Sequence, residues 1–263
     1  MAELTRTRTG DWSRLRAATP ARIFLERAGT AIATRDHLAF QRAHAAARDA
    51  VHDRFDAAPL REGLEQRGLD YVSLRSEASD RPTYLARPDL GRRLDAPSRE
   101  RLAQLPTGHD LVFVLADGLS ARAVERHALP LLDEALPEFR RLGWKLGPIA
   151  IVEQARVAIG DAIGAALDAR LVAMLIGERP GLSASDSMGI YLTWAPAPGR
   201  SDAERNCLSN IRGGGMTYDE ATRRLVYLAT AAQQRKLTGI ALKDDTGMVN
   251  AVLPRERRLA SRE

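Results

Sequence analysis

The second half of the chain contains short runs of apolar residues, separated by turns and by helical patterns. The runs are Asp110–Ala116, Ile149–Val152, Leu171–Ile176 and Met188–Trp194. Apolar runs of this length without polar alternation are typical of strands buried on both faces, as in a parallel sheet covered by helices. The last run alternates and is expected nearer the sheet edge, with no strand after it. The pattern predicts an α/β fold with a Rossmann-like, mostly parallel sheet flanked by helices.

The first part of the chain shows helical periodicity instead. Apolar residues recur every three to four positions over one long segment: Phe40, Ala43, Ala47, Val51 and Phe55. This stripe predicts a helix from about Arg35 to Phe55 that is capped by Thr34. A short helix is expected from Pro20 to Gly29, because proline is favoured at the first helical position and glycine just after the last.

Glycine and proline become frequent between Pro59 and Pro106 and divide the helical pattern into short segments. We expect helices at 60–66, 90–94 and 98–104 and one strand near 70–74. The change to the α/β pattern places a domain boundary between Pro97 and Pro106. We therefore divide the chain into a smaller N-terminal helical domain (1–100), a Rossmann-like domain (101–242) and a polar, basic tail (243–263) that we predict to be disordered.

Three helices are expected between and after the strands of the second domain. Ser120 is placed to cap the helix that follows the strand 110–116. A second helix is predicted near 160–168. Thr217 and Glu220 have the spacing of a capping box and predict a helix that continues to about Leu237 and is closed by Gly239.

Composition indicates an ordinary globular protein. The chain has 263 residues, of which 44% are hydrophobic and 28% are charged. No apolar run approaches the roughly 18 to 20 residues that cross a bilayer, and the start lacks the apolar core of a secretory signal. The single cysteine, Cys207, excludes an internal disulfide and fits a reducing, cytoplasmic location.

The charge pattern argues against nucleic acid as a partner. The formal net charge is +5, but the basic residues are nearly all arginines that lie among acidic residues along the chain. Aromatic residues make up 5% of the chain, too few for evident base-stacking surfaces. An arginine-rich contact surface for a partner subunit or for an anionic cofactor explains this charge better.

Two local patterns suggest chemistry without establishing it. Asp117-Gly118-Leu119-Ser120 joins a predicted strand to a helix start, which is a place where phosphate can bind. The chain has neither glycine fingerprint of nucleotide-binding loops, so Asp117 and Ser120 fit turn and cap roles equally well. The histidines of the long N-terminal helix, His37, His44 and His52, are spaced for a polar helix face, and His37 and His44 are about 10 Å apart along the axis. We therefore predict neither a catalytic cluster nor a metal site.

Several longer runs, in the same order, resemble the small (light) subunit of ethanolamine ammonia-lyase. The runs are Thr19–Ile23, Arg27–Gly29, Leu38–His52, His109–Ser120, Val152–Asp161, Leu175–Leu182 and Asn206–Ile211. The resemblance covers roughly residues 19 to 242. The short N-terminus and the tail after Lys243 depart from the family.

The resemblance implies a hetero-oligomer with a radical mechanism. In this family a TIM-barrel large subunit carries the substrate site, and adenosylcobalamin lies between the two subunits. The cobalt–carbon bond of the cofactor breaks homolytically, and the adenosyl radical takes a hydrogen from ethanolamine, which is converted to acetaldehyde and ammonia. On this interpretation the chain encloses the cofactor. Enclosure of the complex in a bacterial microcompartment is an open alternative to free cytoplasm.

The resemblance also implies three cofactor-binding positions, Val157, Glu178 and Cys207. All three are expected at the rim formed by the carboxyl ends of the strands, where ligands bind in sheets of this type. From the sequence alone Val157 also fits a core residue, Glu178 a loop charge and Cys207 a small buried residue. No Asp-x-His-x-x-Gly run occurs, so we expect the cofactor's own dimethylbenzimidazole to remain on cobalt.

Two other interpretations stay open at this point. One is a stand-alone α/β enzyme that binds a nucleotide at Asp117 and Gly118. The other is a purely structural partner subunit that makes no contact with the cofactor.

Overall fold

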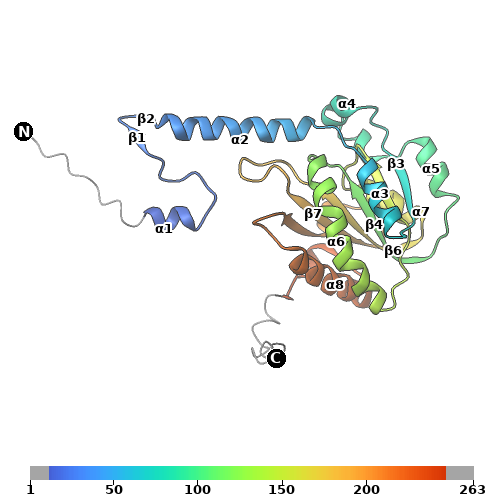
Figure 1. Cartoon of the computed structure of the whole chain (residues 1–263). Helices are drawn as coiled ribbons and strands as arrows, with labels where there is room; N and C mark the ends of the chain where they lie inside the picture. Colours follow the sequence, from blue (N-terminus) through green and yellow to red (C-terminus); the bar gives the residue numbers. More distant parts are fainter. Residues whose placement is uncertain (1–11, 247–263) are drawn as a thin grey trace, which may run out of the picture.

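A six-stranded sheet forms the centre of the protein in the computed structural model, which describes residues 12–246 (Figure 1). The strand order is β3-β5-β4-β6-β7-β8. The strands are β3 (Tyr71–Arg75), β4 (His109–Ala116), β5 (Ile149–Glu153), β6 (Ala169–Gly177), β7 (Met188–Trp194) and β8 (Arg205–Ile211). The first four in spatial order are mutually parallel, whereas β7 and β8 run antiparallel to their neighbours. The fold is therefore mixed α/β with a mostly parallel sheet.

The four apolar runs correspond to β4, β5, β6 and β7, and the separately expected strand near 70–74 corresponds to β3. The expectation that no strand follows Trp194 is wrong, because β8 pairs with β7 over Arg205–Ile211. In β8 only Arg205, Leu208 and Ile211 are buried, and the side chains between them are polar or exposed. A strand at the sheet edge needs no continuous apolar run, so the pattern did not reveal it.

One face of the sheet is covered along its whole width by three helices. They are α3 (Ala58–Gln66), α6 (Ala121–Arg141) and α8 (Tyr218–Arg235) (Figure 1). The apolar stripe of α6 places Leu131 and Phe139 in a core with no solvent exposure, and Phe139 packs edge-on against Phe113 of β4. Burial of this continuous apolar surface is the main source of the stability of the domain.

The opposite face is covered only in part. The helices α5 (Ala96–Leu102) and α7 (Ile159–Ala166) pack over the four parallel strands. Strand β7 contributes to this second core only through Tyr191, which is half-buried, and Cys207 of β8 is exposed. The β7–β8 end of this face is therefore open. We call it the open face.

The N-terminal part of the described chain extends away from the sheet (Figure 1). It consists of α1 (Trp12–Ala17), a hairpin of β1 (Arg27–Ala28) and β2 (Ala31–Ile32), and the long helix α2 (Thr34–His52). The expected helix from Pro20 to Gly29 is absent, because Gly29 has φ of +63° and forms the hairpin turn. Thr34 is not a cap either, since Ala33 occupies that position without a side-chain hydrogen bond.

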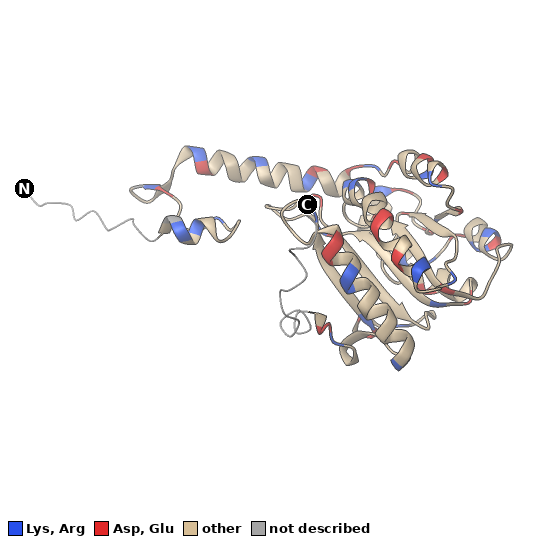
Figure 2. Cartoon of the chain, turned by 60° about the horizontal axis from the view of Figure 1, so that its bottom comes forward, with Lys and Arg blue, Asp and Glu red and all other residues tan. Residues whose placement is uncertain are grey.

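Helix α2 has few contacts with the body of the protein. Of its residues only Ala50 is buried, and basic and acidic side chains are mixed along it (Figure 2). Its carboxyl end is held by Arg81, whose Nε donates to the carbonyl of Val51 at 2.8 Å. The segment before α2, which together with α1, β1, β2 and α2 we call the N-terminal arm, also contacts the body of the protein. Arg22 donates to the carbonyl of Leu182 at 3.5 Å, and Ser183 donates to the carbonyl of Pro20 at 3.4 Å.

The remaining elements are short. Helix α4 (Arg81–Ala86) starts at a cap formed by Asp80, whose side chain accepts the N–H of Thr83. The sequence analysis predicts no helix here, although Pro82 lies in the first turn of α4, where proline is favoured. Three 3-10 turns complete the fold: η1 (Leu90–Arg92), η2 (Asp202–Glu204) and η3 (Gly239–Ala241).

The division of the chain into an N-terminal helical domain, a Rossmann-like domain and a tail stays a prediction. Strand β3 precedes residue 100 and pairs with β5, so the sheet itself crosses the position of the expected boundary. The parallel strands follow the spatial order β3-β5-β4-β6, which differs from the 3-2-1-4-5-6 strand order of a Rossmann sheet, so that label is not confirmed. Most of the tail expected from Lys243 lies outside the described residues.

Candidate functional site

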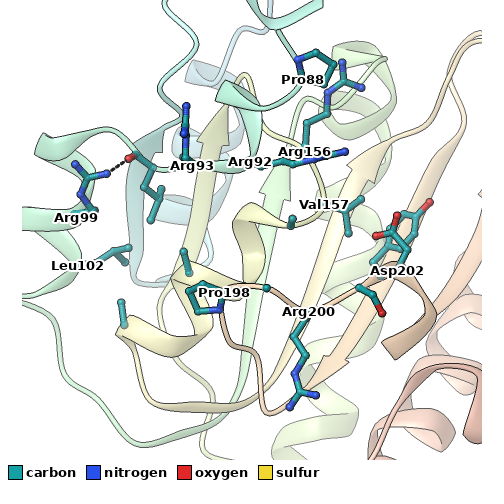
Figure 3. A pocket seen from close by; sticks show the side chains of 17 residues that line it. Pro88, Arg92, Arg93, Arg99, Leu102, Arg156, Val157, Pro198, Arg200 and Asp202 are labelled. Atoms are coloured by element: carbon teal, nitrogen blue, oxygen red, sulfur yellow. Dashed lines mark hydrogen bonds between the residues drawn. The ribbon is translucent and has the colours of Figure 1, made fainter.

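A cavity of about 970 Å³ opens beside the open face, between η1 and α5 on one side and the loop 198–202 on the other (Figure 3). Its apolar floor includes Leu94, Leu102, Ala158 and Ala162. Tyr191 of β7 also lines the cavity. A concave, largely apolar site with a few polar groups is the usual form of a small-molecule site.

Val157 lines this cavity from the turn between β5 and α7. It is half-buried and packs on the core of the partly covered face. The structure thus places Val157 beyond the carboxyl end of β5. Its side chain offers an apolar contact to a ligand in the cavity.

Glu178 is the first residue after β6, and its carboxylate joins two loops. One oxygen accepts hydrogen bonds from the Ser187 hydroxyl at 2.5 Å and from the backbone N–H of Asn210 at 3.2 Å. The other accepts from the Ser209 hydroxyl at 2.5 Å. A carboxylate has about four acceptor positions, so these three hydrogen bonds leave one unfilled by the protein. Gly189 leaves room for this group, since a Cβ there would lie 2.9 Å from Oε1 of Glu178.

Cys207 lies in the middle of β8, directly opposite Tyr191 of β7. The expectation that Cys207 sits beyond a strand end is therefore wrong, because residues 205–211 form a strand that runs antiparallel to β7. Desolvation raises the pKa of the Cys207 thiol, a hydrogen bond from Tyr191 opposes the rise, and the charge of Glu178 adds to it. The thiol is thus kept neutral and presents a soft, uncharged contact.

Tyr191 connects the three predicted positions. It lines the cavity together with Val157, it is hydrogen-bonded to Cys207, and the charge of Glu178 acts on its hydroxyl. Burial raises the pKa of Tyr191, and Cys207 and Glu178 raise it further, so the phenol stays protonated. The sequence analysis passed over this residue. Tyr191 lies between Ile190 and Leu192 in β7, so its side chain points to the opposite face of the sheet. This alternation is the sequence signal that could have indicated Tyr191.

Arginines surround the Pro88 side of the cavity. The guanidinium of Arg156 stacks over the ring of Tyr84, 4.2 Å from its centroid, and donates to the Tyr84 carbonyl at 3.4 Å. The Nε atom of Arg156 is buried without a hydrogen-bond partner. Arg92 is exposed at the same side of the cavity. Neither arginine was singled out from the sequence, because all arginines look alike in the charge pattern.

A buried ion pair ties the two sides of the site together. Arg205 of β8 contacts Asp161 of α7 through two parallel bonds of 2.6 and 2.7 Å, and both side chains are at most 2% exposed. Arg205 also donates to the Thr193 hydroxyl and to the carbonyl of Arg200. The pair fixes the strand that carries Cys207 to the helix that follows Val157.

Comparison with known proteins identifies the family. The family model of the ethanolamine ammonia-lyase light chain matches residues 9–243. The chain belongs to the ethanolamine ammonia-lyase light chain family. It is 56% identical over 238 residues to the ethanolamine ammonia-lyase small subunit of Azotobacter vinelandii, covering 89% of this chain and 88% of that protein. The small subunits of Xanthomonas campestris and Pseudomonas aeruginosa are 56% and 53% identical, with 89% of this chain covered and 88% and 87% of those proteins.

Membership of the light chain family confirms the resemblance found in the sequence. The assignment of Val157, Glu178 and Cys207 as cofactor-binding residues stays a prediction. The structure brings Glu178 and Cys207 together around Tyr191, and it places Val157 in the adjoining cavity.

The turn at Asp117 is occupied by the protein's own contacts. Asp117 is buried, accepts the N–H groups of Ala155 and Gly118, and pairs with Arg81 at 3.2 Å. A Cβ at Gly118 would collide with the backbone of Gly177. The hydroxyl of Ser120 donates to the carbonyl of Ser185 rather than to its own helix. The polar side chains of this turn are therefore engaged within the protein, and the alternative of a nucleotide-binding enzyme is not supported.

Residues 12–246 contain neither a metal-binding cluster nor a membrane-spanning helix. No group of three or more histidine, cysteine, aspartate or glutamate side chains is arranged to hold a metal ion. No helix in that range is both long and apolar enough to cross a membrane.

Proposed function

We propose that the chain is the small subunit of an ethanolamine ammonia-lyase and holds one side of adenosylcobalamin against a large subunit. The open face carries the proposal, because Val157 and Tyr191 line a cavity there, and Glu178 and Cys207 lie next to it around Tyr191. The names of its relatives support the activity, the conversion of ethanolamine to acetaldehyde and ammonia. A cytoplasmic hetero-oligomer follows from this proposal.

The residues present fit the proposed cofactor. Its corrin ring carries neutral amide side chains that need hydrogen-bond acceptors, and Glu178 has one acceptor position unused. Its apolar edges need apolar contacts, which Val157 and Ala158 provide. The neutral thiol of Cys207 lies beside the phenol of Tyr191 and adds a soft contact.

The chain's own contribution is to position the cofactor and exclude water. When bound, adenosylcobalamin supplies radical chemistry through homolytic cleavage of its cobalt–carbon bond. Glu178 orients the loop between β6 and β7 against β8, and Asp161 and Arg205 hold the far side of the site. We assign the substrate-binding groups to the large subunit, so the small subunit acts by binding and orientation.

The test compares Glu178→Ala with Glu178→Gln in the assembled complex. A hydrogen bond to a charged group contributes roughly 1.5 to 3 kcal/mol, so Glu178→Ala should weaken adenosylcobalamin binding about ten- to a hundredfold. Glu178→Gln keeps an acceptor and should lose less. The affinity for ethanolamine should stay nearly constant in both variants.

Ser187→Ala is the matched control, because it removes an internal partner of Glu178 and leaves the carboxylate in place. It should bind the cofactor almost as tightly as the unchanged protein. If Glu178→Ala assembles and retains full cofactor affinity, Glu178 only organises its loop, and its assignment to the cofactor is wrong.

A further inference from the structure

The cavity is rich in arginine for a site with an apolar floor. Five of its lining residues are arginines: Arg92, Arg93, Arg99, Arg156 and Arg200. Three of them contact neighbouring carboxylates, and two of these three share Glu77. Arg93 and Arg99 contact Glu77 at 2.8 and 3.6 Å, and Arg200 contacts Glu204 at 2.5 Å.

The other two, Arg92 and Arg156, form no salt bridge with any of the described residues. In Figure 3 both lie on the Pro88 side of the cavity, across from Arg200. Two positive charges without a counter-charge at the edge of a partly enclosed cavity repel each other and attract an anion. The cavity therefore has a pronounced preference for a negatively charged group at this side.

The backbone holds Arg92 and Arg156 in fixed relation. The backbone N–H of Arg156 donates to the carbonyl of Gly91 at 2.8 Å, which joins the η1 turn to the turn after β5. Gly91 is needed for this approach, since a Cβ there would lie 2.9 Å from Cγ of Arg156 and 3.0 Å from the Tyr84 ring. The stacking of Arg156 on Tyr84 limits the freedom of its guanidinium.

The anion that fits must be joined to a flat apolar group. The floor beside the two arginines is formed by Leu102 and by the alanines Ala158, Ala162 and Ala166 near and in α7. These small side chains leave a shallow apolar surface of the kind on which an aromatic base packs. Val157 joins this surface to the open face.

We propose that Arg92 and Arg156 bind the phosphodiester of the cofactor's nucleotide loop. The inference rests on the proposed function, since it takes adenosylcobalamin as the ligand. The amide side chains of the corrin and the adenosyl group are uncharged, so the phosphodiester is the only anion on the periphery of this molecule. Arginine is the side chain best suited to it, with paired N–H donors that match phosphate oxygens. The dimethylbenzimidazole nucleotide then lies over the alanines of the floor.

The test uses two ligands that differ only in this part. Adenosylcobinamide has the corrin and the adenosyl group of adenosylcobalamin but lacks the nucleotide loop with its phosphodiester. Equilibrium binding of both is measured for the complex with the large subunit, with unchanged chain and with Arg92→Gln, Arg156→Gln and Arg93→Gln. Arg93→Gln is the matched control, because Arg93 lines the same cavity but is already paired with Glu77.

Arg92→Gln and Arg156→Gln should each weaken adenosylcobalamin binding about ten- to a hundredfold and change adenosylcobinamide binding less than about twofold. Arg93→Gln should change neither. The affinity for adenosylcobalamin should also depend less on salt in Arg92→Gln than in the unchanged complex, because one charge contact is lost. If adenosylcobinamide binds too weakly to be compared, or if Arg156→Gln does not fold, the salt dependence of Arg92→Gln is the deciding measurement.

The outcomes separate the two proposals. If the unchanged complex does not bind adenosylcobalamin, the proposed function fails. If it does bind, but the arginine variants weaken both ligands equally or weaken neither, only the phosphodiester assignment is overturned. Loss of assembly with the large subunit in Arg92→Gln would also overturn it, since Arg92 would then be a contact to that subunit.

Discussion

The two faces of the sheet are built from the same strands but are covered differently. On one face α3, α6 and α8 bury a single continuous core. On the other, α5 and α7 cover the parallel strands and leave Tyr191 and Cys207 at the open end. The covered face is held by apolar packing, whereas the open face is held at its edge by an ion pair, Asp161–Arg205.

This difference shows how the fold separates stability from binding. On the covered face the side chains fill the space between helices and strands. The open face places half-buried and polar side chains around a cavity and therefore needs specific tethers to keep its shape. Substitutions on the covered face should affect folding stability alone. Substitutions on the open face should affect folding stability only where they break a specific contact such as the Asp161–Arg205 ion pair.

The largest effect on the free energy of unfolding is expected from the Asp161–Arg205 ion pair. Asp161→Ala removes the buried partner of Arg205 and leaves only the exposed Asp202, 3.4 Å from Nε, and breaking such a buried pair costs roughly 3 to 5 kcal/mol. Asp161→Leu with Arg205→Met should recover much of this loss, because neither residue then leaves a buried charge. The control is Asp219→Ala, whose pair with Arg223 is exposed and contributes roughly 0 to 1 kcal/mol. Denaturant unfolding measures all three, and a loss for Asp161→Ala no larger than the control would break the comparison.

The next effect tests the covered face. Leu131→Ala in α6 removes a fully buried side chain and should cost roughly 2 to 5 kcal/mol of unfolding free energy. The cofactor affinity of the folded complex should not change, since Leu131 lies on the face away from the cavity. Leu142→Ala, just after the same helix, is the control, because its side chain is 42% exposed. Weaker cofactor binding by folded Leu131→Ala would show that the two faces are coupled.

The smallest effect concerns pH. His127 of α6 is buried, and its Nδ1 is 2.8 Å from the hydroxyl of Tyr218 of α8. Burial lowers the pKa of His127 from its usual 6.5, with the charge of Asp186 opposing the shift. The unfolded chain then takes up a proton more readily than the folded one, so stability is complete above pH 6.5 and is lost as the pH falls through the lower folded pKa.

Melting temperatures of the protein and of His127→Gln between about pH 7.5 and 5.5 measure this contribution. The two curves should converge as the pH falls, because the variant has no proton to take up at this position. Parallel curves would mean that His127 does not sense pH in the core.

The sequence revealed those strands whose side chains are apolar on both faces. Asp110–Ala116 and Leu171–Ile176 were found because the structure buries them almost completely. Strand β8 was missed because its outward side chains are polar, and the hairpin at Gly29 was missed because a helix stop and a tight turn use the same residue. Local patterns therefore predicted the strands from β3 to β7 and the long helix α2, and failed at the β8 edge and at the N-terminal hairpin.

The candidate site could be predicted only in pieces. The resemblance supplied Val157, Glu178 and Cys207, but not their connection through Tyr191, which depends on the pairing of β7 with β8. Arg92 and Arg156 are 64 positions apart by their numbering and meet because η1 bonds to the turn after β5. Which arginines lack a carboxylate is a property of the folded chain, so no count of charges could have selected these two.

The attachment of α2 has a mechanical consequence. A helix of 19 residues is about 28 Å long, and Arg81 fixes this one at its carboxyl end, at Val51. A lever of that length turns a tilt of about 10° at the pivot into a displacement of about 5 Å at its tip. The segment leading to α2 rests on Leu182 and Ser183, in the loop that begins with Glu178. A neighbour that pushes on the arm therefore also pushes on that loop, and through it on the carboxylate proposed to hold the cofactor.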